Sequence, residues 1–253
     1  MNAKGSTEVL LRALCLTAMA KQYEALAGRA EKEAWSHPQY LRNLCEVELS
    51  ERTTRRVERR LKQSGLPDGK TLETLDLNRL PAKVRRQIPR LLEGTFVDRA
   101  ENILAFGLPG RGKTHLVSAI ARELIVRHNR RALSISAFHL VQQMLRAKKD
   151  LALEALLRKL DRYDVVLLDD IGYVQQNREE MEVLFTFLSE RYERRSLMIT
   201  SNLVFSEWDK IFKDPMTTAA AIDRLVHHSI ILELDGDSYR AQHAKTKKQK
   251  GGD

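Results

Sequence analysis

Several kinds of residue and segment are scarce in this chain of 253 residues. It has two cysteines, Cys15 and Cys45, too few for a disulfide framework or a cysteine metal cluster. Both lie among apolar neighbours, so we expect buried thiols. No run of eighteen apolar residues occurs, which excludes a membrane-spanning helix and a membrane partner. Arg12 interrupts the first apolar stretch and no cleavage site of small residues follows, so we expect no signal peptide and a cytoplasmic protein.

Aromatic residues are also few, at 6% of the chain. Proteins that bind single-stranded nucleic acid usually stack its bases on aromatic side chains, so this composition mildly favours duplex backbone as a partner. Hydrophobic residues make up 43% and charged residues 30%, which is typical of a folded protein and not of a disordered one. The length suits one large domain, or a mid-sized domain with a smaller appendage.

The net charge of +9 is distributed unevenly. Residues 1–99 carry 19 Lys and Arg against 13 Asp and Glu, residues 100–239 carry 19 against 20, and residues 240–253 carry 5 against 1. Basic flanks around a neutral middle are the footprint of a polyphosphate partner such as DNA, although a solvated helix face is the alternative. Our candidates for DNA contact are Arg52, Arg55, Arg56, Arg59, Arg60, Lys62, Arg85 and Arg86.

The spacing of apolar residues predicts one helix over residues 7–34, a second over 39–63 and helical structure within 81–98. The sequence SGLPDG at 64–69 predicts a turn and a linker between them. We therefore expect a small all-helical domain over residues 1–70, a second domain over 71–239, and a basic tail over 240–253. The tail is either a contact for a partner or a solvated, disordered end.

The second domain alternates short apolar runs with helical segments. The runs lie at residues 103–106, 132–135, 165–168, 197–200 and 230–232. Continuous apolar strands between helices are typical of a parallel sheet covered on both faces. The predicted fold is α/β, with a parallel five-stranded sheet covered by helices.

A glycine-rich loop follows the first of these runs. The sequence GLPGRGKT fits G-x-x-x-x-G-K-[ST] and stands between a predicted strand and a helix predicted over 115–126. Backbone N–H groups of such a loop face phosphates, while its lysine neutralises their charge and its threonine hydroxyl binds Mg²⁺. A glycine-rich turn without a ligand is the alternative. The nucleotide-binding candidates are Gly107, Leu108, Pro109, Gly110, Arg111, Gly112, Lys113 and Thr114.

Polar residues follow the later strands. Asp169 and Asp170 end the run at 165–168, where we expect Asp169 to orient Mg²⁺ and Asp170 to polarise the attacking water. Asn202 follows the next run and either contacts the γ-phosphate or its water, or caps a helix. Arg224 ends a helical segment, where it either forms a surface ion pair with a neighbour such as Asp223 or reaches the γ-phosphate of another subunit.

With these motifs the chain resembles the IstB/DnaC-like group of AAA+ ATPases, and most closely the IstB-type helpers of insertion-sequence transposition. The blocks that carry the resemblance are residues 11–26, 46–61, 71–76, 102–116 and 223–240. The resemblance implies an ATPase that uses ATP and Mg²⁺. It implies Lys113, Asp169 and Asp170 as catalytic residues, Asn202 as a first sensor, and Arg224 as an arginine finger acting in trans.

The resemblance further implies a protein that assembles with ATP into homo-oligomers on duplex DNA, deforms it, and recruits or stimulates a transposase. Asp170 stands where many AAA+ proteins have Glu, so we expect slow hydrolysis, and a helper of this group is expected to be stimulated by DNA. Arg111 stands where Thr is common and either binds phosphate or faces solvent. About twenty residues follow Leu234, too few for a helical lid domain, which leaves Arg240 as the candidate second sensor. The alternatives are a loader of a replicative helicase and a non-hydrolysing, nucleotide-gated scaffold.

Overall fold

The computed structural model describes residues 3–173, 178–203, 207–208 and 215–234. The chain folds as two compact units, residues 1–59 and residues 60–253, and the division falls inside helix α3 (His37–Ser64). Arg240 and the basic tail lie outside the described residues. No helix in the described part has the length and apolar character needed to cross a bilayer.

The N-terminal unit is helical, but the single helix expected over residues 7–34 is wrong. Two helices are present, α1 (Ala3–Ala13) and α2 (Thr17–Lys32). Cys15 separates them because it adopts a left-handed backbone, with φ of 59°. The N–H of Leu16 bonds the carbonyl of Leu11 and that of Cys15 bonds the carbonyl of Arg12, a pattern that terminates a helix.

The apolar faces of this unit are only partly covered, and the expectation of buried thiols is wrong. Met19 and Leu44 are buried, whereas both cysteines are exposed. On α3, Cys45 lies four residues from Leu41 and four from Leu49, so the three share one helix face. Both leucines are exposed as well, at 59% and 64%. Apolar neighbours therefore did not indicate burial here.

A buried carboxylate on α3 caps the start of α2. Oε2 of Glu48 accepts hydrogen bonds from the N–H groups of Ala18 and Met19 at 2.8 and 3.1 Å, and its side chain is held by Arg52 through Oε1 at 2.8 Å. Burial alone raises the pKa of Glu48, but the bonds from Arg52, Met19 and Ala18 outweigh it and lower the pKa below its usual range. Glu48 is therefore bound in its ionised form.

We expect Glu48→Ala to open the start of α2, because Ala18 and Met19 lose their acceptor, at a cost of about 1–2 kcal/mol. The ionised form is the one that folding favours, so the stabilisation is present above the ordinary pKa of 4.5 and is lost as the pH falls through the lowered value. Hydrogen exchange at Ala18 and Met19 measures the opening. Exposed Glu46 on the same helix gives the control, Glu46→Ala, and equal exchange in both variants would contradict the cap.

The second unit is built on a five-stranded sheet, as predicted. Its strands are β1 (Asn102–Phe106), β2 (Ala132–Ser136), β3 (Val165–Asp169), β4 (Ser196–Ser201) and β5 (Ser229–Glu233). They lie in the order β2-β3-β4-β1-β5, and every neighbouring pair is parallel. Since β4 lies between β1 and β3, the carboxyl ends of these three strands meet at one edge of the sheet.

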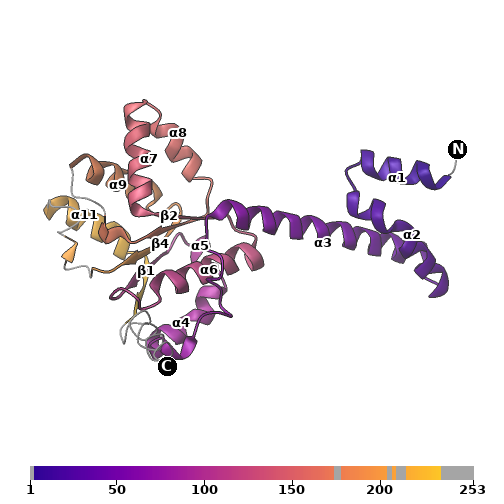
Figure 1. Ribbon diagram of the computed structural model, residues 1–253, viewed down its shortest axis with the longest axis horizontal. Coiled ribbons are helices and arrows are strands. Elements are labelled where there is room, and N and C mark those ends of the chain that lie inside the picture. The colour runs from indigo at the N-terminus through magenta and orange to yellow at the C-terminus, as the bar shows by residue number, and fades with distance from the viewer. Residues whose placement is uncertain (1–2, 174–177, 204–206, 209–214, 235–253) are drawn as a thin grey trace, which may run out of the picture. The chain divides into compact units, whose positions relative to one another are not determined.

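Helices cover both faces of the sheet (Figure 1). One side carries α4 (Ala82–Leu92) and α6 (Lys113–His128). The other carries α7 (Ala137–Lys149), α8 (Leu153–Leu160), α9 (Arg178–Arg191) and α11 (Pro215–Val226), whose apolar residues form one core with Leu104, Val166 and Ile199. Shorter helices are η1 (Leu77–Arg79), α5 (Thr95–Asp98) and η2 (Ile171–Tyr173). The helical structure predicted within residues 81–98 corresponds to α4 and α5.

Candidate functional site

The glycine-rich loop joins β1 to α6 at the carboxyl edge of the sheet (Figure 1). Gly107 has φ of 146°, and a Cβ there would lie 2.4 Å from the carbonyl oxygen of Leu234, so no other residue fits. Gly112, with φ of 85°, precedes α6, and among the described residues no side chain caps this helix. The loop thus offers backbone N–H groups and a helix N-terminus to an anion.

Lys113 is buried within this loop, with 5% of its surface exposed. Its ammonium donates to the carbonyls of Gly107 and Leu108 at 2.6 and 3.1 Å, and to Oδ1 of Asn202 at 2.6 Å. Lys113 and Asn202 are therefore in direct contact although they lie far apart in the chain. The structure therefore places Asn202 beside the loop lysine.

Asp169 connects the loop to the neighbouring strands. Its Oδ1 accepts a hydrogen bond from Oγ1 of Thr114 and another from Oγ1 of Thr200, each at 2.7 Å. Thr114 and Asp169, the two residues predicted from the sequence to bind Mg²⁺, are thus in direct contact. A threonine hydroxyl and a carboxylate are hard oxygen ligands of the kind that Mg²⁺ takes, so this donor set fits the ion.

Thr200 is a site residue that sequence reasoning missed. It ends the apolar run at 197–200 and is fully buried, and a hydroxyl at that place in a strand was the available signal. Its Oγ1 also accepts the N–H of Asp170 at 2.8 Å. Asp170 has a left-handed backbone with φ of 58°, which Asp tolerates better than most residues. Thr200 therefore fixes both acidic residues.

Arg111 lies between two glycines of the loop. Its Nε and Nη1 atoms are shielded from solvent and have no hydrogen-bond partner within the described part of the chain. Leaving a buried donor without an acceptor costs about 1–3 kcal/mol. These two nitrogens of Arg111 do not face solvent in the described structure.

His115 joins the start of α6 to the segment at residues 71–76. Its Nε2 lies 3.1 Å from the carbonyl oxygen of Thr71 and 3.1 Å from Oγ1 of Thr74. Sequence reasoning treated this segment only as a block of resemblance and did not single out Thr74 or His115. The contact places the segment beside the helix that begins at the loop.

Arg224 is not joined to the loop in this chain. It donates to Oγ of Ser189 on α9, and its guanidinium lies 4.7 Å from the ring centroid of Phe185 on the same helix. We find no ion pair between Arg224 and Asp223 in the described part of the structure. Of the predicted catalytic residues, Lys113 thus meets Asn202, whereas Arg224 contacts α9.

The basic candidates fall into two groups. Arg52 forms an ion pair with Glu48. Arg55 forms an ion pair with Glu51 at 2.8 Å and donates a hydrogen bond to Thr17. Arg60 is half-buried and also takes part in an interaction within the chain. The others are exposed, and the described residues form no ion pair with them: Arg56, Arg59, Lys62, Arg85 and Arg86.

Comparison with known proteins agrees with these features. The family described as IstB-like ATP binding protein matches residues 9–247. A Sinorhizobium fredii protein named for ATP binding in an insertion sequence is 40% identical over 96% of this chain and 82% of its own. A similarly named protein of insertion sequence IS5376 from Geobacillus stearothermophilus is 38% identical over 95% of each chain.

Solved structures support the fold alone. A structure of DnaI, 21% identical, covers 68% of this chain and 96% of its own with a TM-score of 0.57. The DnaC helicase loader, 13% identical, covers 66% of this chain and 98% of its own with a TM-score of 0.56. The AMPPCP-bound DnaA of Aquifex aeolicus, 20% identical, covers 74% of this chain and 57% of its own with a TM-score of 0.55. The match to nearly the whole chain, with two relatives at 38–40% identity, confirms the resemblance: the protein belongs to the family of IstB-like ATP binding proteins.

Proposed function

We propose that this protein is a DNA-stimulated ATPase that assists transposition, assembles on duplex DNA with ATP, deforms it, and recruits or stimulates a transposase. The observation that carries the proposal is the contact of Thr114 with Asp169 and of Lys113 with Asn202 at one edge of the sheet. Lys113 and Thr114 begin α6 after the loop that follows β1, Asp169 ends β3, and Asn202 follows β4. Together they provide a cation, an anion and two neutral polar groups for a triphosphate.

Each residue has a distinct role in this proposal. Lys113 binds and neutralises the phosphates, and Thr114 with Asp169 would hold Mg²⁺, which would supply further neutralisation of phosphate charge. Asp170 orients the attacking water and accepts its proton. Asn202 touches the lysine that binds the phosphates and therefore senses them. Because Asp170 has a shorter side chain than Glu, we expect slow turnover.

We expect Arg111 to add a contact to the phosphates. Arg111→Ala should weaken ATP binding by about tenfold, or about 1.4 kcal/mol, because it removes two shielded donors beside the nucleotide. Titration with a fluorescent ATP analogue measures the affinity, and thermal unfolding should show no loss of stability, because the removed donors have no partner in the described structure. Arg127→Ala, at the far end of α6, is the control. Unchanged affinity in Arg111→Ala would contradict this role.

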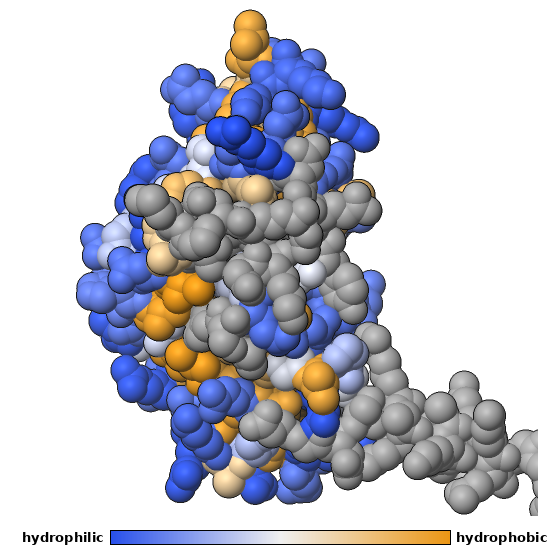
Figure 2. Space-filling view, turned by 90° about the vertical axis from the view of Figure 1, so that its left-hand side faces the viewer, coloured by the Kyte–Doolittle hydropathy of each residue, from blue (hydrophilic) through white to orange (hydrophobic). Residues whose placement is uncertain are grey.

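We assign Arg224 to the nucleotide site of a neighbouring subunit. In the described part of the chain Arg224 contacts α9 and not the loop, which supports this assignment. The face turned to the viewer in Figure 2 shows apolar patches among hydrophilic side chains. Interfaces between separately folded chains are about as apolar as the rest of a protein surface, so a face of this composition can serve as a contact. ATP bound by one subunit would then be hydrolysed only in an assembly.

Mixing two inactive variants tests this assignment. Lys113→Ala and Arg224→Ala should each lack turnover alone, but the mixture should regain part of it, because Arg224 of one variant can serve the intact loop of the other. The measurement is phosphate release at constant total protein with duplex DNA. Arg224→Ala should bind ATP and unfold like the unaltered protein. A mixture as inactive as its components would overturn the action in trans.

The exposed basic residues are the proposed contacts with DNA. Arg56, Arg59 and Lys62 follow one another along α3, and Arg85 and Arg86 lie on α4. We assign the helical region of residues 1–70 to contact with DNA or a partner protein. Bending a DNA site costs about 1–6 kcal/mol, which contacts from several subunits to the phosphates can offset. The names of the relatives, which refer to insertion sequences, support a role in transposition.

A further inference from the structure

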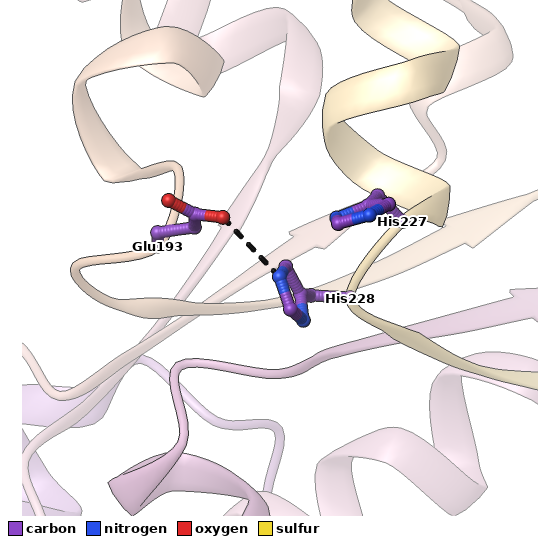
Figure 3. Close-up of side chains that lie close together, drawn as sticks. All are labelled: Glu193, His227 and His228. Carbon is purple, nitrogen blue, oxygen red and sulfur yellow. Dashed lines mark ion pairs between the residues drawn. The ribbon is translucent and has the colours of Figure 1, made fainter.

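Two histidines and a glutamate come together outside the nucleotide site. Glu193 lies in the turn between α9 and β4, and His227 and His228 connect α11 to β5. Each residue offers one ligand atom, and these atoms all lie within 4.8 Å of one another. Figure 3 shows the carboxylate of Glu193 directed at the imidazole of His228, with His227 above it at the end of the helix.

The position of this cluster separates it from the ATP site. Strands β4 and β5 begin at residues 196 and 229, just after the cluster, so it lies at the amino-terminal edge of the parallel sheet. The phosphate loop and Asp169 lie at the carboxyl edge. A ligand bound here would therefore not touch the nucleotide.

The backbone of the cluster is fixed while its side chains are accessible. The carbonyl of His228 accepts the N–H of Asn102 at 2.7 Å, and the N–H of His227 bonds the carbonyl of Asp223 at 3.0 Å. The side chains of His228 and Glu193 are 41% and 55% exposed. An ion can thus reach the three side chains without a change in the fold.

We propose that Glu193, His227 and His228 bind a first-row divalent metal ion of the kind represented by Zn²⁺. Two imidazoles and one carboxylate form a ligand set that Zn²⁺ accepts, whereas Mg²⁺ and Ca²⁺ prefer oxygen ligands alone. In a tetrahedral zinc site, two nitrogen or oxygen ligand atoms that both contact the ion lie about 3.3 Å from each other. Nε2 of His228 and the carboxylate of Glu193 are already 3.2 Å apart.

Binding then requires only a small adjustment of His227. Its ring lies 4.5 Å from that of His228, centroid to centroid, at an angle of 86°. Rotation of the exposed His227 side chain brings its nitrogen to the ion, and water completes the coordination. The ion would join the turn after α9, which leads into β4, to the junction between α11 and β5, and only β1 separates β4 from β5 in the sheet.

Calorimetric titration of the full chain with ZnCl₂, without nucleotide, tests the site. We expect one tight site per chain, at least about tenfold weaker in His228→Ala and in Glu193→Gln. Zinc should raise the unfolding temperature of the unaltered protein and not of these variants. His37→Ala, which removes an exposed histidine on α3, is the control and should bind like the unaltered protein.

Two further measurements keep the outcome unambiguous. Circular dichroism of the metal-free variants should match that of the unaltered protein, which excludes misfolding as the cause of lost binding. Co²⁺ should give the absorption of a tetrahedral site in the unaltered protein alone. Equal zinc affinity in the unaltered protein and both variants, or an equal response to MgCl₂, would overturn the proposal.

Discussion

Replacement of Lys113 by Ala is expected to abolish ATP binding. The ammonium of Lys113 is buried and donates to two loop carbonyls and to Asn202, so it is held at the place where the phosphates of a nucleotide lie in such loops. Loss of a buried, charge-assisted donor of this kind costs about 3 kcal/mol or more, which is over about 100-fold in affinity. Titration with a fluorescent ATP analogue measures the affinity for nucleotide.

The same variant should lose every property that depends on nucleotide. Assemblies on duplex DNA and ATP turnover should both disappear, while the fold remains. Lys149→Ala, which removes an exposed lysine on α7, is the matched control and should bind ATP normally. ATP affinity in Lys113→Ala equal to that of this control would refute the assignment of the loop.

Asp169→Asn is expected to remove hydrolysis and leave much of the nucleotide affinity. The amide keeps the shape of the side chain and can still accept the hydroxyls of Thr114 and Thr200, but it lacks the charge that holds Mg²⁺. We expect turnover to fall by at least about 100-fold, or about 3 kcal/mol in the barrier. Phosphate release with varied MgCl₂ measures both the rate and its dependence on the ion.

The control for this variant separates charge from position. Thr200→Val keeps the carboxylate but removes a donor to Asp169 and the acceptor for the N–H of Asp170, so it should lower turnover less than Asp169→Asn does. Asp170→Asn should lower turnover without changing the affinity for Mg²⁺. Turnover in Asp169→Asn equal to that of the unaltered protein would contradict the role of Asp169 in holding Mg²⁺. If the unaltered protein binds ATP without hydrolysing it, the result would support a non-hydrolysing scaffold.

The features that depend on local sequence were predictable. The phosphate loop is a continuous motif between a strand and a helix, and Asp169 ends a fully apolar strand, so neighbours in the chain define both. The five strands were predicted because each is a short apolar run between helical segments. Asn202 was identified by its place after a strand, although only the order of strands in the sheet shows that it meets Lys113.

The features that depend on packing were not predictable. Thr200 and Asp170 interact because β3 and β4 are neighbours in the sheet, which no local pattern reveals. The left-handed backbone of Cys15 divides a helix in a stretch whose apolar spacing is continuous. Glu48 caps α2 from another helix. The exposure of Cys45 follows from a helix face that the N-terminal unit leaves uncovered, whereas its neighbours in sequence suggested a core.

The central claim is that ATP binding drives assembly of this protein on duplex DNA. The most direct test is light scattering after size-exclusion chromatography, with electron microscopy, of the protein and a duplex of about 50 base pairs, long enough for several subunits to contact its phosphates. ATP, ADP and a single strand are compared. Large assemblies that require both ATP and duplex are the predicted result; a small species indifferent to duplex, or equal assembly with ADP, would contradict the claim.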